Sequence, residues 1–151
     1  MTASSTDRIE RSIELKAPLA RVWRALTDHQ EFGEWFQVKL EAPFVPVHTT
    51  RGRTLYPGFE HPMELMVEKM EKERLFSYRW HPYAVDPKVD YSKEPTTLVE
   101  FVLEAIPSGT RLRVIESGFD AIPASRRAEA FRMHEGGWAV QIQNVAKHVG
   151  G

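Results

Sequence analysis

The alternation of apolar and polar positions near the start of the chain predicts a strand. Over residues 8–16 the apolar side chains share one parity and the polar side chains share the other: Ile9, Ile13 and Leu15 against Glu10, Ser12 and Glu14. This period of two is typical of a half-buried strand. Arg11 interrupts the apolar face, so the pattern leaves the first residue of the strand open.

Two short helices are expected next. Ala17-Pro18 opens the first, because proline at the first helical position loses no intrahelical hydrogen bond. Apolar residues then recur at helical spacing, as Leu19, Val22, Trp23 and Leu26. Asp28, with Glu31 three residues later, forms a capping-box pattern, which predicts a second helix ending near Trp35-Phe36.

The stretch up to about residue 117 has a pattern of strands and loops. Strands are expected at 38–40, 50–55, 63–70, 74–80, 96–106 and 110–117. Ser108-Gly109 is the turn between the last two. Residues 43–62 are otherwise irregular because they are rich in proline, and residues 81–95 form a long charged loop with three prolines.

The final segment, from about Pro123 to Val149, has the pattern of a helix. Its apolar residues are spaced by seven, four, three and four: Phe131, Trp138, Ile142, Val145 and Val149. Short spacings between the strands favour an antiparallel sheet, and a sheet with one apolar face needs a partner such as this helix. We therefore expect an α+β fold, with residues 1–151 forming one domain and residues 1–7 a flexible tail.

Composition narrows the function classes. The 151 residues include no cysteine, and the formal net charge is -1, which argues against disulfides, cysteine metal sites and electrostatic capture of nucleic acid. Apolar runs are too short for a membrane helix, and residues 1–7 lack the apolar core of a signal peptide. We expect a cytoplasmic protein that binds neither nucleic acid nor membrane.

The order of several short motifs resembles the bacterial relatives of the Hsp90 ATPase activator C-terminal domain, within the START/Bet v1-like, or helix-grip, superfamily. The motifs that carry the resemblance span nearly the whole chain: Ile13-Glu14-Leu15-Lys16-Ala17-Pro18, Val22-Trp23-Arg24-Ala25-Leu26-Thr27-Asp28, Glu34-Trp35-Phe36, Arg74-Leu75 with Tyr78 and Trp80, Thr97-Leu98-Val99-Glu100-Phe101, Gly109-Thr110-Arg111-Leu112, Glu116-Ser117-Gly118-Phe119 and Gly136-Gly137-Trp138. The resemblance implies about seven antiparallel strands curved around a long C-terminal helix, with a cavity between them.

The resemblance does not imply a single activity. Members of the superfamily include binders of apolar ligands and cyclase-like enzymes, and the family is named for a chaperone activator. In the eukaryotic co-chaperone an additional N-terminal domain makes a major contact with Hsp90. The first strand here begins near residue 8, so we expect that domain to be absent. A chaperone-associated, Hsp90 activator-like interaction module stays open as an alternative to ligand binding and to an enzyme.

Aromatic side chains are the main candidates for a ligand site. Seven of them are expected to point between the sheet and the helix: Trp35, Phe36, Tyr78, Trp80, Phe101, Phe131 and Trp138. Each could equally be ordinary core. As a set they predict a pocket for a small apolar or aromatic molecule, since ligand sites are mostly apolar with a few polar groups.

Two polar residues fall on inward positions and are the candidates for proton transfer. Glu116 shares the parity of Leu112 and Val114, and His134 lies on the helix face of Trp138. A buried acid without a partner has a raised pKa and could share a proton with a nearby histidine. The pair could serve a cyclase- or hydratase-like enzyme. Alternatively, Glu116 lies hydrated at the rim and His134 is structural.

Other polar and glycine positions add less. Parity leaves open whether Glu64 and Arg79 face inward. Gly136-Gly137 in the middle of a helix favours a close approach of the backbone to the sheet or a ligand. The histidines show no metal-ligand spacing and no cofactor motif is present. We expect neither metal nor cofactor, and as partners a small apolar ligand and a second copy of the chain.

Overall fold

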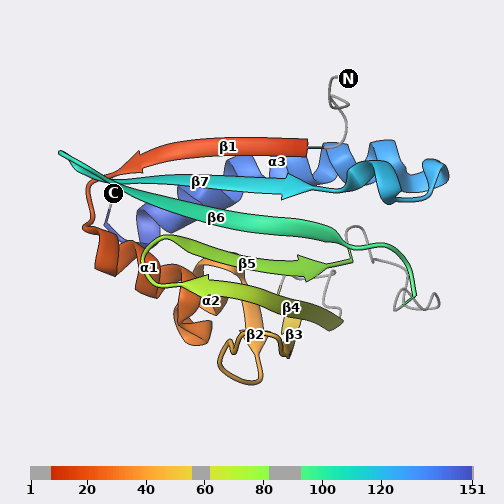
Figure 1. Cartoon of the computed structure of the whole chain (residues 1–151), viewed down its shortest axis with the longest axis horizontal. Coiled ribbons are helices and arrows are strands. Elements are labelled where there is room, and N and C mark those ends of the chain that lie inside the picture. Colours follow the sequence, from red (N-terminus) through yellow and green to blue (C-terminus); the bar gives the residue numbers. More distant parts are fainter. Residues whose placement is uncertain (1–7, 56–61, 82–92, 151) are drawn as a thin grey trace.

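The computed structural model describes residues 8–55, 62–81 and 93–150. It is a curved antiparallel sheet with a long helix lying across one face (Figure 1). The strands are β1 (Arg8–Leu15), β2 (Val38–Leu40), β3 (Thr49–Thr54), β4 (Pro62–Glu71), β5 (Leu75–Trp80), β6 (Thr97–Ile106) and β7 (Gly109–Ser117), and the helices are α1 (Leu19–Thr27), α2 (His29–Phe36), the short 3-10 helix η1 (Phe119–Ala121) and α3 (Ala124–His148).

The sheet order is β1-β7-β6-β5-β4-β3-β2, with every neighbouring pair antiparallel. Strands β2 to β7 form a meander, and its last strand, β7, pairs with β1 at the start of the chain. This confirms the predicted α+β helix-grip architecture, including the two short helices after the first strand and the long C-terminal helix. Strand ends agree with the sequence pattern within one residue. That residues 1–151 form one domain stays a prediction, and the expected tail at 1–7 and most of the loop at 81–95 lie outside the described residues.

The turn between β6 and β7 requires glycine. Gly109 has φ +145, and a Cβ atom there would lie 2.1 Å from the carbonyl oxygen of Leu15. Thr110 follows, and its hydroxyl donates to the carbonyl oxygen of Ala17 at 2.9 Å. The turn therefore places the start of β7 in contact with the end of β1 and with the residues that precede α1.

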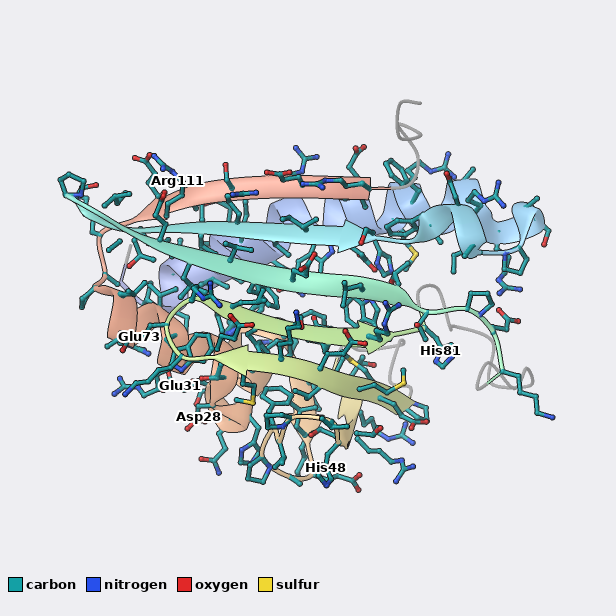
Figure 2. All side chains as sticks on the ribbon, in the orientation of Figure 1. Asp28, Glu31, His48, Glu73, His81 and Arg111 are labelled. Atoms are coloured by element: carbon teal, nitrogen blue, oxygen red, sulfur yellow. The ribbon has the colours of Figure 1, made fainter. Side chains whose placement is uncertain are left out.

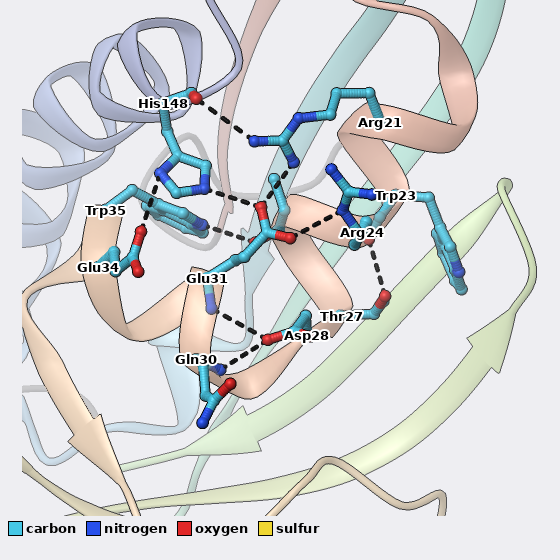
Figure 3. A network of polar contacts seen from close by, with 11 residues as sticks. Arg21, Trp23, Arg24, Thr27, Asp28, Gln30, Glu31, Glu34, Trp35 and His148 are labelled. Atoms are coloured by element: carbon cyan, nitrogen blue, oxygen red, sulfur yellow. Dashed lines mark hydrogen bonds and ion pairs between the residues drawn. The ribbon is translucent and has the colours of Figure 1, made fainter.

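The two short helices begin as the sequence predicts, with one difference in each. Pro18 caps α1 rather than forming its first turn. Asp28 caps α2, and its carboxylate accepts from the backbone N–H groups of Gln30 and Glu31. The reciprocal half of the capping box is absent, because the Glu31 side chain turns toward α1 and α3 instead (Figure 3).

The inner face of the sheet and one face of α3 form the core. Ala130, Trp138, Ile142 and Val145 of α3 are buried, whereas Phe131 and Val149 are partly buried. On the outer face, Arg111 bridges Glu14 at 3.0 Å and Glu104 at 2.6 Å (Figure 2). None of the helices in the described ranges combines the length and apolar character needed to cross a membrane.

Candidate functional site

A buried carboxylate lies where β5 ends, β6 begins and β7 ends. Antiparallel pairing brings these three strand termini together at one end of the strands, on the right in Figure 1. Glu116 pairs with Val99 on one side and Ile9 on the other, so its side chain points to the inner face. It is 0% exposed. The alternative that Glu116 lies hydrated at the rim is therefore wrong.

Four donors surround this carboxylate. Oε1 accepts from His134 Nδ1 at 2.7 Å and from the indole Nε1 of Trp138 at 2.8 Å. Oε2 accepts from the indole Nε1 of Trp80 at 2.7 Å and from the hydroxyl of Thr97 at 2.5 Å. Two donors on each oxygen satisfy a carboxylate, which can therefore remain ionised without water.

The environment of Glu116 favours its charged form. Burial alone would raise its pKa, but the electrostatic interaction with His134 and the hydrogen bonds from His134, Thr97 and Trp80 bring the pKa below its usual range. The expectation of a raised pKa assumed an acid without partners, and it fails because four partners converge on this one. Glu116 therefore accepts hydrogen bonds as a carboxylate and does not hold a proton to donate.

His134 lies between this carboxylate and the surface. Its ring packs edge-on against Trp80, with centroids 5.4 Å apart, and against Phe119 at 5.8 Å. The side chain is 13% exposed. Since an ionised carboxylate only accepts, Nδ1 carries the hydrogen that it donates to Glu116. The second ring nitrogen is the one left for other chemistry.

Aromatic rings continue inward from this polar centre. Trp138 packs against Trp80 at 5.8 Å, Phe101 at 5.7 Å and Phe36 at 6.3 Å. Trp35 contacts Phe101 at 6.3 Å, and its indole N–H donates to the carbonyl oxygen of Ala25. Trp80 is partly exposed, whereas the other four rings are buried. One side of the cluster therefore reaches the surface.

Tyr78 differs from its neighbours in having an unpaired polar atom. Its side chain is fully buried, and Oη has no hydrogen-bond partner within the described part of the chain. Its ring packs against Trp80 at 5.3 Å and Phe101 at 6.1 Å. Burial first, and the charge of Glu116 second, raise the pKa of Tyr78 well above its usual range. The hydroxyl therefore keeps its proton.

The structure brings most of the predicted site residues together, with one at the margin. Phe131 contacts Phe119 at 5.3 Å and lies one helical turn before His134. Sequence reasoning missed Thr97 and Phe119 as site residues. Thr97 shares the parity of Val99 on β6, so a hydroxyl facing inward could have been found. Phe119 follows Gly118, whose φ of +100 turns the chain inward after β7.

The geometry also places the remaining glycine and polar candidates. The close approach expected between the backbone at Gly136-Gly137 and the sheet is wrong, because a Cβ atom at either position would meet nothing within 4 Å in the described part of the chain. An approach to a ligand at these glycines stays a prediction. Glu64 and Arg79 face outward, each in an ion pair, with Arg51 at 3.3 Å and Glu68 at 2.8 Å respectively.

A groove elsewhere in the described residues could be mistaken for a site. An open groove of about 410 Å³ lies along β2, β3 and β4 and shares no residue with the Glu116 cluster. Its walls include the paired Arg51 and Glu64. Within residues 8–55, 62–81 and 93–150 no three His, Asp or Glu side chains are grouped so that they could hold a metal ion.

A second polar cluster joins the three helices (Figure 3). Glu31 of α2 accepts from Arg21 at 2.6 Å and Arg24 at 2.8 Å, both on α1, and contacts His148 of α3 at 2.9 Å. Burial alone would raise the pKa of Glu31, but its hydrogen bonds from His148 and Arg21 lower it. Three partners from α1 and α3 already bind its carboxylate, so this cluster connects the helices.

The family model described as "Activator of Hsp90 ATPase homolog 1-like protein" matches residues 16–150. No curated protein matches the chain. A protein of Mesorhizobium loti has a similar structure, with TM-score 0.74 and 22% identity, covering 94% of this chain and 96% of that one. A Nitrosomonas europaea protein has TM-score 0.75 and 17% identity, covering 99% of this chain and 97% of that one. The Aha1 dimer of Colwellia psychrerythraea has TM-score 0.69 and 17% identity, covering 94% of this chain and 95% of that one. At these identities the likeness shows the fold.

Proposed function

Because the chain belongs to the activator of Hsp90 ATPase homolog 1-like family, we propose that it binds a small apolar or aromatic molecule between α3 and the sheet, without strong catalysis. The observation that carries the proposal is an aromatic cluster with one polar centre. Phe101 and Trp138 are buried, while Trp80 and His134 beside Glu116 are partly exposed. An apolar wall with a few placed polar groups is typical of small-molecule sites.

The state of Glu116 argues against strong catalysis by this carboxylate. A general base must have a free acceptor position for the proton it takes, and both oxygens of Glu116 already accept two hydrogen bonds each. Within this proposal Glu116 holds the indole N–H groups of Trp80 and Trp138, and so sets the orientation of both rings that line the ligand site.

Native mass spectrometry of freshly purified protein, with solvent extraction of its small molecules, tests the proposal. We expect added mass that extraction removes, and tryptophan emission that changes saturably when an aromatic probe is added back. Trp80→Phe should reduce the change. Trp23→Phe should not, because none of the ring contacts among the described residues involves Trp23. Protein that carries no added mass and binds no probe would contradict the proposal.

A proton-transfer enzyme is the second candidate, favoured by the 2.7 Å contact of Glu116 with His134 Nδ1. A carboxylate on one ring nitrogen fixes the tautomer and makes the other nitrogen a better base. In that case His134 transfers the proton and Glu116 is a positioning residue. NMR titration of the His134 ring, compared between wild type and Glu116→Gln, tests whether Glu116 acts on the basicity of His134. An unchanged titration removes this candidate.

Partners and location complete the proposal. The structural neighbour from Colwellia psychrerythraea is a dimer, and we extend dimer formation to this chain, to be tested by light scattering. The family description also raises an interaction with Hsp90, for which capture of purified Hsp90 by the immobilised protein is the test. We place the protein in the cytoplasm, which cell fractionation checks.

A further inference from the structure

We infer that the Tyr78 hydroxyl donates a hydrogen bond to the bound molecule, which is therefore a neutral aromatic compound with a carbonyl-type acceptor. This inference rests on the proposed binding function and names the chemical class of its ligand. It is carried by a buried polar atom that the described residues leave without a partner, inside a wall of aromatic rings.

The described residues around Tyr78 give its hydroxyl no acceptor. The rings packed around it are those of Phe32, Phe76, Trp80 and Phe101, at centroid distances of 5.3 to 6.3 Å. None of these side chains carries an acceptor oxygen, and the indole N–H of Trp80 is already bonded to Glu116. A buried hydroxyl that loses water and gains no partner is unfavourable, so a ligand that supplies an acceptor removes this cost.

Charge restricts the acceptor to a neutral one. Glu116 is buried and ionised near the same cluster, so a carboxylate or phenolate ligand would meet a like charge in a medium that screens poorly. A cation gains little, because four donors already occupy the Glu116 oxygens. The proton of Tyr78 is retained, since burial and Glu116 raise its pKa. The hydroxyl is therefore a donor facing a neutral acceptor.

The aromatic part of the ligand follows from the wall itself. Edge-on and tilted ring contacts dominate the cluster around Tyr78 and Trp138, and such geometry favours another aromatic ring over an aliphatic chain of equal area. An aryl ketone combines both requirements, because it has a flat apolar body and one strong acceptor. It also brings no hydrogen-bond donor that would itself need a partner.

Three matched probes test the inference by equilibrium dialysis against wild type and Tyr78→Phe. They are 2-acetonaphthone, its hydrocarbon analogue 2-isopropylnaphthalene, and the anion 2-naphthoate. Removal of the hydroxyl should weaken binding of the ketone about tenfold, the size of one good hydrogen bond, and leave the hydrocarbon unchanged or slightly tighter. The ratio of the two dissociation constants, wild type against Tyr78→Phe, is compared between ketone and hydrocarbon. Differences in the water solubility of the probes cancel in this ratio, which leaves the hydrogen bond between hydroxyl and carbonyl. Naphthoate should bind wild type more weakly than the ketone.

The outcomes separate this inference from the function on which it rests. If no probe binds wild type saturably, the proposed binding function fails. If ketone and hydrocarbon respond alike to Tyr78→Phe, or naphthoate binds as tightly as the ketone, the ligand class is wrong and the apolar site stands. Thermal unfolding is the control for folding. Because Oη has no partner in the described residues, Tyr78→Phe should not lower the melting temperature, and a clear loss would overturn the inference.

Discussion

At the scale of single residues, Glu116 is the polar centre of the molecule. Its carboxylate is 0% exposed and accepts from Trp80, Thr97, His134 and Trp138. Removal of one partner from a buried, hydrogen-bonded charge costs more than the net worth of the pair, because the remaining groups stay buried without partners. The stability of the fold should therefore depend strongly on this one side chain.

Glu116→Gln tests that dependence. The amide replaces an oxygen that accepts two hydrogen bonds with an NH₂ group that faces two donors, so we expect the free energy of unfolding to fall by about 3–5 kcal/mol. Urea denaturation at neutral pH measures it. The control is Glu104→Gln, whose parent side chain is 62% exposed in its ion pair with Arg111, and which should cost less than about 1 kcal/mol. Equal losses would contradict the central role of Glu116.

The same substitution has a defined pH dependence. The pKa of Glu116 is lowered in the folded state, so its contribution is fully present above the unfolded glutamate pKa of about 4.3. The contribution disappears as the pH falls through the lowered folded pKa. The stability difference between wild type and Glu116→Gln should therefore narrow in acid. A difference that stays constant from neutral pH down to about pH 3 would show that folding does not lower the pKa of Glu116.

At the scale of elements, α3 combines strong anchoring with a weak middle. Trp138, Ile142 and Val145 bury its second half against the sheet. Gly136 and Gly137 precede Trp138, and a Cβ atom at either would meet no described residue within 4 Å. Glycine in a helix costs conformational entropy and contributes no packing, so these two positions reduce the stability of α3 without a steric reason for glycine.

Alanine at either position should stabilise the protein. The expected gain for Gly136→Ala or Gly137→Ala is up to about 1 kcal/mol each, the difference in helix propensity. Gly52→Ala is the control with the opposite sign, because its Cβ atom would lie 2.5 Å from the carbonyl oxygen of Lys39. Chemical denaturation of the three variants measures the signs. A loss at position 136 or 137 would indicate a contact that a ligand or partner makes there.

At the scale of the whole molecule, two polar centres join the helices to the rest of the fold. Glu116 of β7 connects the sheet to the middle of α3 through His134 and Trp138. Glu31 connects the end of α3 to α1 and α2 through Arg21, Arg24 and His148 (Figure 3). Glu31 and His148 lie 117 positions apart in the chain, so their contact forms only when α3 has packed against α2.

Glu31→Gln should loosen the helical layer while the sheet stays intact. We expect a loss of about 1 kcal/mol in the free energy of unfolding, as for an ion-pair network near the surface, and faster hydrogen exchange at the end of α3 and in α1. Glu34→Gln is the control, since Glu34 is 70% exposed and lies 3.7 Å from His148. Faster exchange throughout β6 and β7 would contradict a local role for Glu31.

Much of the fold could be predicted from the pattern of side chains alone, because each pattern reports a local geometry. Period two identified the strands, helical spacing identified α3, and parity placed Glu116 on the inner face. The same reasoning placed His134 on the face of Trp138. These inferences succeed because the direction of a side chain depends on its own element, whatever that element packs against.

Only the tertiary structure decided what those inward residues meet. The donors to Glu116 come from positions 80, 97, 134 and 138, on elements whose mutual placement no local pattern contains. The charge of Glu116 follows from that convergence. The Tyr78 hydroxyl, which has no partner among the described residues, and the turning of Glu31 away from its own helix cap depend in the same way on neighbours from other elements. Sequence therefore determined the elements and their faces. The protonation states and the polar contacts depend on distances between elements, which only the packing of the whole fold sets.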